Sequence, residues 1–239
     1  MTIPSHQDPL GLALKEYLQG LDTPDLLVKS DISEDDYYEV AYYFREEREM
    51  PEWEKVALSH CRGKVLDIGA GSGCHSLVLQ QRGLEVLALD NSPGAVEVMK
   101  ARGVHSVRLG DVFTFQKHGF DTLLLLMNGL GIVGDFKGLR AFLKLARSWL
   151  NPEGQIILDS SDIAYLLEDE VILSQMLDRE QAFGEVRFQL CYNGLCGEEF
   201  SWLYLDYESL ASIAATQGFG SKLLAKGPHF EYVAKLTML

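Results

Sequence analysis

From Lys64 onward, short apolar runs alternate with helical stretches, and this alternation limits the fold more than any other feature. The runs are KVLDIGA from Lys64, LEVLALD from Leu84, SVRL from Ser106, FDTLLLLM from Phe120 and QIILDS from Gln155. Nearly continuous apolar strands are typical of a parallel sheet that is covered on both faces. Between them, apolar residues recur at three- and four-residue steps, most clearly from Leu139 to Leu150. The pattern therefore predicts an α/β domain with right-handed crossovers.

The segments on either side of this core follow other patterns. Residues 1–60 and residues 163–183 are expected to be helical. Between the core and the C-terminal segment, Val186, Phe188, Leu190 and Tyr192 alternate with polar residues, as do Phe200, Trp202 and Tyr204. The Asn193-Gly194 pair between these two runs favours a tight turn, so they predict an antiparallel hairpin. The chain is expected to end with one helix and two strands, near 207–217, 220–226 and 229–238.

The composition excludes several classes of partner. The chain has 35 acidic against 21 basic residues and a formal net charge of −14, so nucleic acid is not expected to bind. It lacks a long uncharged apolar run and a signal-peptide pattern, which favours a cytoplasmic protein without membrane contact. Four scattered cysteines do not make a disulfide framework, and Cys191 and Cys196 lack partners at zinc spacing. Reduced thiols and no metal site are therefore expected.

The first strand of the core ends in the glycine-rich sequence VLDIGAGSG, from Val65 to Gly73, and a helix is expected to follow at once. Glycines let the backbone approach a ligand, and a helix N-terminus offers free N–H groups to a carboxylate. Asp90 ends the second strand, where a carboxylate can accept hydrogen bonds from both ribose hydroxyls. Asp111 follows the third strand and is placed to accept from an adenine amine, with Val112 packing on the base. These residues predict a ligand that contains a nucleoside.

Together, VLDIGAGSG, the acid that ends the next strand, GDVF and FDTLLLLM resemble the successive motifs of class I S-adenosylmethionine-dependent methyltransferases. LNPEGQIILDS resembles the loop and fifth strand of that family, so the resemblance covers roughly residues 60–160, and the last two strands agree in order. It implies a Rossmann-like, mostly parallel sheet of seven strands in the order 3-2-1-4-5-7-6, with strand 7 antiparallel. One domain is expected, made of a helical N-terminal region or lid (1–60), a cofactor-binding core (61–162), an insert with the hairpin (163–206) and a final helix and strands (207–239).

The resemblance also implies S-adenosyl-L-methionine as the cofactor and assigns residues to it. These are Asp67, Gly69, Ala70, Gly71, Gly73, Cys74, Asp90, Asn91, Asp111, Val112 and Asn128. A nicotinamide site is disfavoured, because Cys74 stands where the dinucleotide motif requires Gly or Ala. The implied activity is in-line methyl transfer to a small molecule. A non-catalytic subunit that binds the same cofactor and an NAD(P)-dependent oxidoreductase are the alternatives.

The acceptor is less constrained than the cofactor. Met127-Asn128-Gly129 stands where enzymes that methylate planar amide or base nitrogens carry an Asn/Asp-Pro-Pro-aromatic run, which disfavours that subclass. In-line methyl transfer depends largely on the alignment of the nucleophile, the methyl group and the sulfur atom. A dedicated base is therefore not required, and no catalytic residue is identified. No feature of the sequence specifies an oligomeric state.

Arg45 is expected to bind the carboxylate of the cofactor's methionine moiety, because a guanidinium completes the partial positive charge of a helix N-terminus. It follows the aromatic run Tyr42-Tyr43-Phe44, which either forms a lid over the cofactor or packs on the sheet. The alternative for Arg45 is an ordinary surface pair with one of its acidic neighbours, which are Glu46, Glu47 and Glu49.

Three further groups of residues admit two interpretations each. Tyr192, Phe200, Trp202 and Tyr204 either shape an acceptor pocket or belong to a hairpin that extends the sheet or forms a dimer contact. The residues from Asp159 to Asp162 either face a ligand or cap the next helix. For His75, which follows the glycine loop, a structural position is favoured over a catalytic one.

Overall fold

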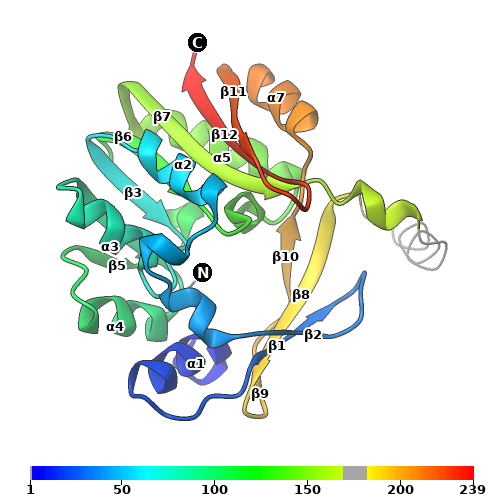
Figure 1. Cartoon of the computed structure of the whole chain (residues 1–239). Helices are drawn as coiled ribbons and strands as arrows, with labels where there is room; N and C mark the ends of the chain where they lie inside the picture. Colours follow the sequence, from blue (N-terminus) through cyan, green and yellow to red (C-terminus); the bar gives the residue numbers. More distant parts are fainter. Residues whose placement is uncertain (1, 169–181) are drawn as a thin grey trace.

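The computed structural model describes residues 2–168 and 182–239. Within these residues, seven strands form one sheet in the order β5-β4-β3-β6-β7-β12-β11 (Figure 1). β12 runs antiparallel to both of its neighbours, β7 and β11, and the other adjacent strands pair in parallel. The fold class, strand order and polarity implied by the resemblance are therefore confirmed. The strands are β3 (Lys64–Ile68), β4 (Glu85–Asp90), β5 (Val107–Leu109), β6 (Phe120–Leu125), β7 (Leu150–Ser161), β11 (Phe219–Lys226) and β12 (Glu231–Met238).

Helices cover both faces of this sheet (Figure 1). Val65 packs with residues of α2 and α3, whereas the next residue, Leu66, packs with residues of α5 and α7 on the opposite face. Successive side chains of a strand point to opposite faces, so an unbroken apolar run fills both cores. The helices are α2 (Glu52–His60), α3 (Cys74–Gln81), α4 (Pro93–Ala101), α5 (Phe136–Trp149) and α7 (Tyr207–Thr216), with the 3-10 helices η4 (Val112–Thr114) and η5 (Gly129–Val133) in loops.

The N-terminal region is not wholly helical, and the prediction for residues 1–60 is wrong in this respect. Before α2 it contains η1 (Ser5–Gln7), α1 (Pro9–Leu18), the strands β1 (Leu26–Ser30) and β2 (Asp36–Tyr38), η2 (Val40–Phe44) and η3 (Glu47–Glu49). Asp8 anchors this region to the core, because its carboxylate accepts hydrogen bonds from Ser92 Oγ at 2.7 Å and from the Gly94 nitrogen at 3.0 Å. The region therefore lies against the start of α4.

β1 and β2 join the inserted hairpin in a second sheet, ordered β10-β8-β1-β2. β8 (Glu185–Tyr192) pairs with β10 (Phe200–Leu203), and the short β9 (Leu195–Cys196) lies at the turn. The predicted hairpin is thus confirmed, but it pairs with a distant N-terminal strand, in register Leu27 opposite Cys191. Figure 1 shows this sheet extending away from the carboxyl edge of the main sheet. Of the helix expected over 163–183, η6 (Ala164–Glu168) is present as a 3-10 helix, and residues 169–181 lie outside the described residues.

Cys191 and Cys196 form a disulfide across this hairpin, so the expectation of reduced thiols is wrong for this pair. The turn between them has the left-handed residues Asn193 (φ 49°) and Gly194 (φ 79°), which bring the strand ends together. The two cysteines stand opposite each other in the β8–β9 pairing. Cys61 and Cys74 are free and buried.

Candidate functional site

The glycine-rich loop joins β3 to α3 at the carboxyl edge of the main sheet. Gly69, Gly71 and Gly73 have φ values of 73°, 56° and 82°, in the left-handed region that favours glycine. Asp67 braces the loop from below, since its carboxylate accepts a hydrogen bond from Ser76 Oγ at 2.6 Å and is only 2% exposed. The sequence thus folds here into a turn whose backbone is free of side chains at three positions.

Asp90 ends β4 beside this loop. Its Oδ2 accepts a hydrogen bond from the Gly71 nitrogen at 2.8 Å, and its Oδ1 accepts from the Ser92 nitrogen at 2.9 Å. Burial raises the pKa of Asp90 to about 6, although both backbone hydrogen bonds act in the opposite direction. A carboxylate oxygen can accept more than one hydrogen bond, so Asp90 retains acceptor capacity for a bound hydroxyl group.

The aromatic residues of η2 lie over the glycine loop. Ser72 Oγ donates a hydrogen bond to the backbone oxygen of Tyr43, and a Cβ added at Gly71 would lie 3.7 Å from the Tyr43 ring. Phe44 instead packs on Tyr17 of α1, with the ring centres 4.6 Å apart. Tyr43 therefore covers the glycine loop, whereas Phe44 packs on α1 and not on the main sheet.

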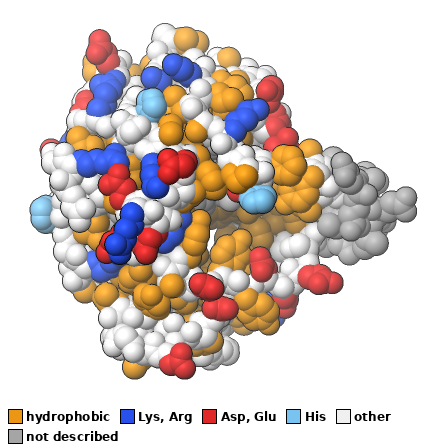
Figure 2. Space-filling view, viewed as in Figure 1, with side chains coloured by type: hydrophobic (Ala, Val, Ile, Leu, Met, Phe, Trp, Pro, Cys, Tyr) orange, Lys and Arg blue, Asp and Glu red, His pale blue; other side chains and the backbone are white. Residues whose placement is uncertain are grey.

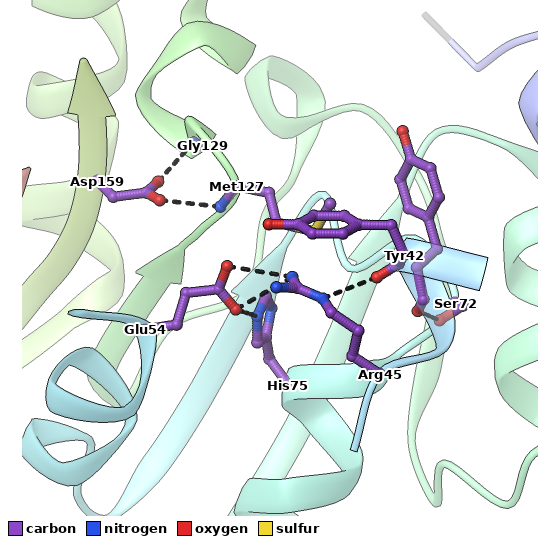
Figure 3. Close-up of polar contacts among 9 residues, drawn as sticks. Tyr42, Arg45, Glu54, Ser72, His75, Met127, Gly129 and Asp159 are labelled. Atoms are coloured by element: carbon purple, nitrogen blue, oxygen red, sulfur yellow. Dashed lines mark hydrogen bonds and ion pairs between the residues drawn. The ribbon is translucent and has the colours of Figure 1, made fainter. Parts of the chain in front are cut away.

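Arg45 follows η2 and enters a buried polar cluster with Glu54 and His75 (Figure 3). Its Nε donates to the Tyr42 backbone oxygen at 2.8 Å, and its guanidinium lies 3.6 Å from the centre of the Tyr42 ring. Its Nη2 donates to the two Glu54 carboxylate oxygens at 3.1 and 3.2 Å. Arg45 is 8% exposed, so the alternative of a surface pair with its acidic sequence neighbours is wrong.

Nη1 of Arg45 is the one buried side-chain nitrogen or oxygen in residues 2–168 and 182–239 that has no hydrogen-bond partner. Leaving a buried donor unpaired costs about 1–3 kcal/mol, more when the group is charged, and folded proteins rarely do so. The guanidinium is held on three sides by Tyr42 and Glu54, so it cannot turn to satisfy this donor within the cluster. Nη1 therefore lacks an acceptor, which an oxygen atom of a ligand could supply.

Glu54 lies between two cationic groups. Besides the ion pair with Arg45, its carboxylate contacts His75 Nε2 at 3.0 Å. Burial acts to lower the pKa of His75, but the neighbouring Cys74 and Glu54 raise it well above its ordinary value. Burial acts to raise the pKa of Glu54, but the contacts with His75 and Arg45 bring it below its ordinary value. With His75 protonated, the cluster carries two positive charges and one negative charge, a net charge suited to one carboxylate.

Asp159, near the end of β7, holds the loop that follows β6 (Figure 3). Its carboxylate accepts hydrogen bonds from the Met127 nitrogen at 3.1 Å and from the Gly129 nitrogen at 2.8 Å. Met127 (φ 66°) and Asn128 (φ 54°) are left-handed non-glycine residues, and these bonds stabilise that backbone. Burial raises the pKa of Asp159 to about 7. Asp159 thus supports a loop, a role that neither interpretation of this stretch includes, whereas Asp162 caps η6 through the Ala164 nitrogen, as one of them does.

The residues expected around an adenine lie on the β5 side of the same edge. The Asp111 carboxylate accepts from the Phe113 nitrogen at 2.8 Å and caps η4, whose first residue, Val112, is buried. Asn91 is exposed beside Asp90, and its backbone oxygen accepts from the Ile3 nitrogen. A cavity of about 430 Å³ opens beside Asp111. The glycine loop and Asp90 thus lie between this group and the Arg45 cluster.

Most of the residues assigned from the sequence meet at this edge. Those that are buried are Arg45, Asp67, Ala70, Gly73, Cys74, Asp90 and Val112, whereas Gly69, Gly71, Asn91, Asp111 and Asn128 are at least partly exposed. Tyr192 does not line the space between the two sheets, because its ring is buried among residues of α1 and α4 and its hydroxyl bonds to Glu16. Sequence reasoning missed Glu54, which carries no motif. In the described part of the chain, no group of His, Cys, Asp and Glu could hold a metal ion, and no helix is long and apolar enough to cross a membrane.

Comparisons with known proteins agree with this geometry. A family model described as a methyltransferase domain matches residues 65–154. A SAM-dependent methyltransferase from Bacteroides fragilis, solved with S-adenosyl-L-homocysteine, is 39% identical, with a TM-score of 0.91 over 100% of this chain and 98% of that chain. No curated protein matches the sequence.

Two more distant structures share the fold. An amino pentose methyltransferase from Micromonospora echinaspora is 17% identical, with a TM-score of 0.55 over 87% of this chain and 100% of that chain. A 1,6-didemethyltoxoflavin N1-methyltransferase from Burkholderia thailandensis is 15% identical, with a TM-score of 0.52 over 82% of this chain and 80% of that chain. Together with the extensive similarity to the Bacteroides protein, these findings show that the chain belongs to the SAM-dependent methyltransferase family.

Proposed function

We propose that the protein transfers a methyl group from S-adenosyl-L-methionine to a small molecule by in-line displacement. The observation that carries this proposal is the buried, unpartnered Nη1 of Arg45 beside the glycine loop. The residues present fit the cofactor, because a carboxylate supplies the acceptor that this donor lacks and the negative charge that the cluster lacks. The Bacteroides relative, with its bound S-adenosyl-L-homocysteine, supports the same ligand class.

Each part of the cofactor has residues suited to it. Arg45 and the backbone of the glycine loop would hold the carboxylate, and Asp90 would accept hydrogen bonds from the ribose hydroxyls. Asp111 and Val112 would receive the adenine, whose base packs on apolar side chains. When bound, S-adenosyl-L-methionine supplies an electrophilic methyl group on a sulfonium.

The chain's own part in such a reaction is chiefly one of alignment. Asp159 fixes the loop Met127–Gly129 next to the glycine loop, where Ile132 would contact a Cβ added at Gly69 at 3.0 Å. The second sheet lies against the same edge, where Trp202 of β10 packs on Gly131 of η5. Fixed positions of this kind supply the orientation on which an in-line displacement depends, without a dedicated base.

A small acceptor fits the charge and the enclosure of the site. With a net charge of −14, the chain would repel a polyphosphate backbone. The hairpin aromatics Phe200, Trp202 and Tyr204 lie in the second sheet or directly after it, and none is charged. The insert is therefore proposed to cover the acceptor, with Tyr192 left out of that set.

The experiment is a calorimetric titration of the full-length protein with S-adenosyl-L-homocysteine, adenosine and NADH. The wild type is expected to bind S-adenosyl-L-homocysteine and not NADH. In Arg45→Ala the affinity for S-adenosyl-L-homocysteine is expected to fall by at least about tenfold, while adenosine, which has no carboxylate, binds as before.

Arg48→Ala is the matched control, because Arg48 is exposed and pairs only with Glu46 at the surface. Arg45→Lys keeps the positive charge but loses the several fixed donors of the guanidinium, and it replaces Arg45→Ala in the test if the alanine variant does not fold. Equal losses for S-adenosyl-L-homocysteine and adenosine would contradict the assignment of Arg45. Absence of S-adenosyl-L-homocysteine binding by the wild type would contradict the proposed function itself.

A further inference from the structure

One face of the second sheet is aromatic and faces the main domain. Directly paired residues of antiparallel strands share a face, as do alternate residues along one strand. Phe188 is opposite both Ser30 and Phe200, and Trp202 is opposite Val186. By the same rule, Val28 and Tyr38 lie on this face, because Tyr38 is opposite Leu26. We call these residues the aromatic face: Tyr38, Val28, Ser30, Val186, Phe188, Phe200 and Trp202.

Three rings of this face, together with Tyr204, which directly follows β10, form a continuous row. The Phe188 and Phe200 centres are 6.2 Å apart, Phe200 and Trp202 are 6.0 Å apart, and Tyr204 lies 6.3 Å from Phe188. All four rings are only partly buried, whereas the neighbouring Val186 is completely buried. Figure 2 shows a hollow bordered largely by hydrophobic side chains between the two parts of the molecule. Partly exposed rings beside a hollow offer stacking surface to a flat molecule.

The aromatic face adjoins the proposed cofactor site at two points. The indole of Trp202 packs directly on Gly131 of η5, where an added Cβ would overlap Nε1. Tyr38 is the last residue of β2 and is followed within five residues by Tyr43, which covers Gly71. Burial, with a smaller electrostatic contribution from Tyr38, raises the pKa of Tyr43 to about 12. A molecule on this face therefore lies next to the loops that bind the cofactor.

The charge on this face is low. Among Asp, Glu, Lys, Arg and His residues of the described strands, only Asp36, opposite Val28 at the exposed start of β2, lies on this face. Lys29, Glu185 and Arg187 belong to the opposite face by the same alternation. Arg45, the cation on the cofactor side, is already engaged by Glu54. A charged acceptor group would lose its hydration here without gaining a partner, and a cation would also be repelled by a sulfonium.

We propose that the aromatic face is the acceptor site and that it binds an uncharged, flat, apolar small molecule between Trp202, Phe200, Phe188 and Tyr38. The proposal rests on the proposed function for its position next to a methyl donor. It names the class of acceptor, which carries its nucleophilic atom in a neutral form and uses ring stacking as its main contact.

The test uses three probes of one shape that differ in charge: 2-naphthol, 2-naphthoate and protonated 2-naphthylmethylamine. Each is titrated into the full chain saturated with S-adenosyl-L-homocysteine at pH 7. The expected result is that 2-naphthol binds at least about tenfold more tightly than either charged probe. Trp202→Ala is expected to weaken 2-naphthol binding by about tenfold, since stacking on a large ring is lost.

Tyr37→Ala is the matched control, because Tyr37 is 63% exposed and alternates to the other face of β2. Phe200→Leu removes a ring with little change in volume and replaces Trp202→Ala if that variant is unfolded. Binding of a charged probe as tightly as 2-naphthol, binding of none of the probes, or equal effects of the face variants and Tyr37→Ala would overturn the proposal. If the wild type bound no S-adenosyl-L-homocysteine, that result would instead contradict the proposed function.

Discussion

Asp159→Asn is the substitution whose effect on stability follows most directly from the structure. Asp159 is 4% exposed, and its carboxylate accepts two backbone hydrogen bonds, from Met127 and Gly129. Asparagine has nearly the same shape and stays neutral at every pH. The variant therefore isolates the cost of placing a negative charge at this buried position.

The magnitude follows from the pKa. Burial raises the pKa of Asp159 from 3.8 to about 7, so the folded protein holds this proton at pH values where the unfolded chain has released it. Stability is then lost as the pH rises from about 4 to about 7, by roughly 1.4 kcal/mol per pH unit. Between pH 5 and pH 8 the wild type should lose about 3 kcal/mol relative to Asp159→Asn.

The assay is urea denaturation of both proteins at pH 5, 6, 7 and 8 without ligand. The free energy of unfolding of the wild type minus that of Asp159→Asn should fall steadily up to about pH 7 and then level off. Other groups titrate in both proteins, so their contributions cancel in this difference. Asp162→Asn is the matched control, because solvent reaches the Asp162 carboxylate, which caps η6 by accepting a hydrogen bond from the Ala164 nitrogen. Parallel pH dependences for the wild type and Asp159→Asn would refute the reasoning.

Three other substitutions have defined outcomes. Asp90→Ala should weaken binding of both S-adenosyl-L-homocysteine and adenosine by about 1.5–3 kcal/mol, because both carry the ribose; unchanged calorimetric affinities in a folded variant would falsify the assignment. His75→Gln keeps a hydrogen-bond donor for Glu54 but removes one positive charge, so the affinity for S-adenosyl-L-homocysteine should fall by roughly tenfold while the affinity for adenosine stays the same. His118→Gln is the control, and equal effects of His75→Gln on the two ligands would point to a structural role. Gly131→Ala places a methyl group against the Trp202 indole and should destabilise the fold by about 1–3 kcal/mol in chemical denaturation, so a wild-type midpoint would contradict that contact.

The core could be predicted because its signals are local. Strands such as β3 and β6 are nearly continuous apolar runs, and the glycine loop needs left-handed φ values that glycine adopts easily. The same holds for the hairpin, whose Asn193-Gly194 turn is specified by adjacent residues.

The second sheet could not be predicted in full because its central pairing is not local. β1 is five residues long, and its register with β8 joins opposite ends of the sequence. β2 consists of exposed residues and so shows no alternation of burial. Counting cysteines likewise missed the disulfide, since the pairing depends on the turn that brings Cys191 and Cys196 together.

The partner of Arg45 could not be predicted from the sequence either, because this contact also joins separate elements of the chain. The acidic residues next to it in the sequence were plausible partners, but the chain turns after η3 and brings Glu54 of α2 to the guanidinium instead. The aromatic character of Tyr42 and Tyr43 is compatible with a lid, but only the folded chain shows which ring covers Gly71. Contacts between elements depend on packing that no single segment encodes.

A crystal structure of the protein with S-adenosyl-L-homocysteine tests the central claim most directly. The account predicts that the ligand's carboxylate lies within hydrogen-bond distance of Arg45 Nη1, with its ribose hydroxyls on Asp90 and the aromatic face open to the position of the transferred methyl group. A carboxylate bound elsewhere, with Nη1 of Arg45 still unpartnered, would contradict it.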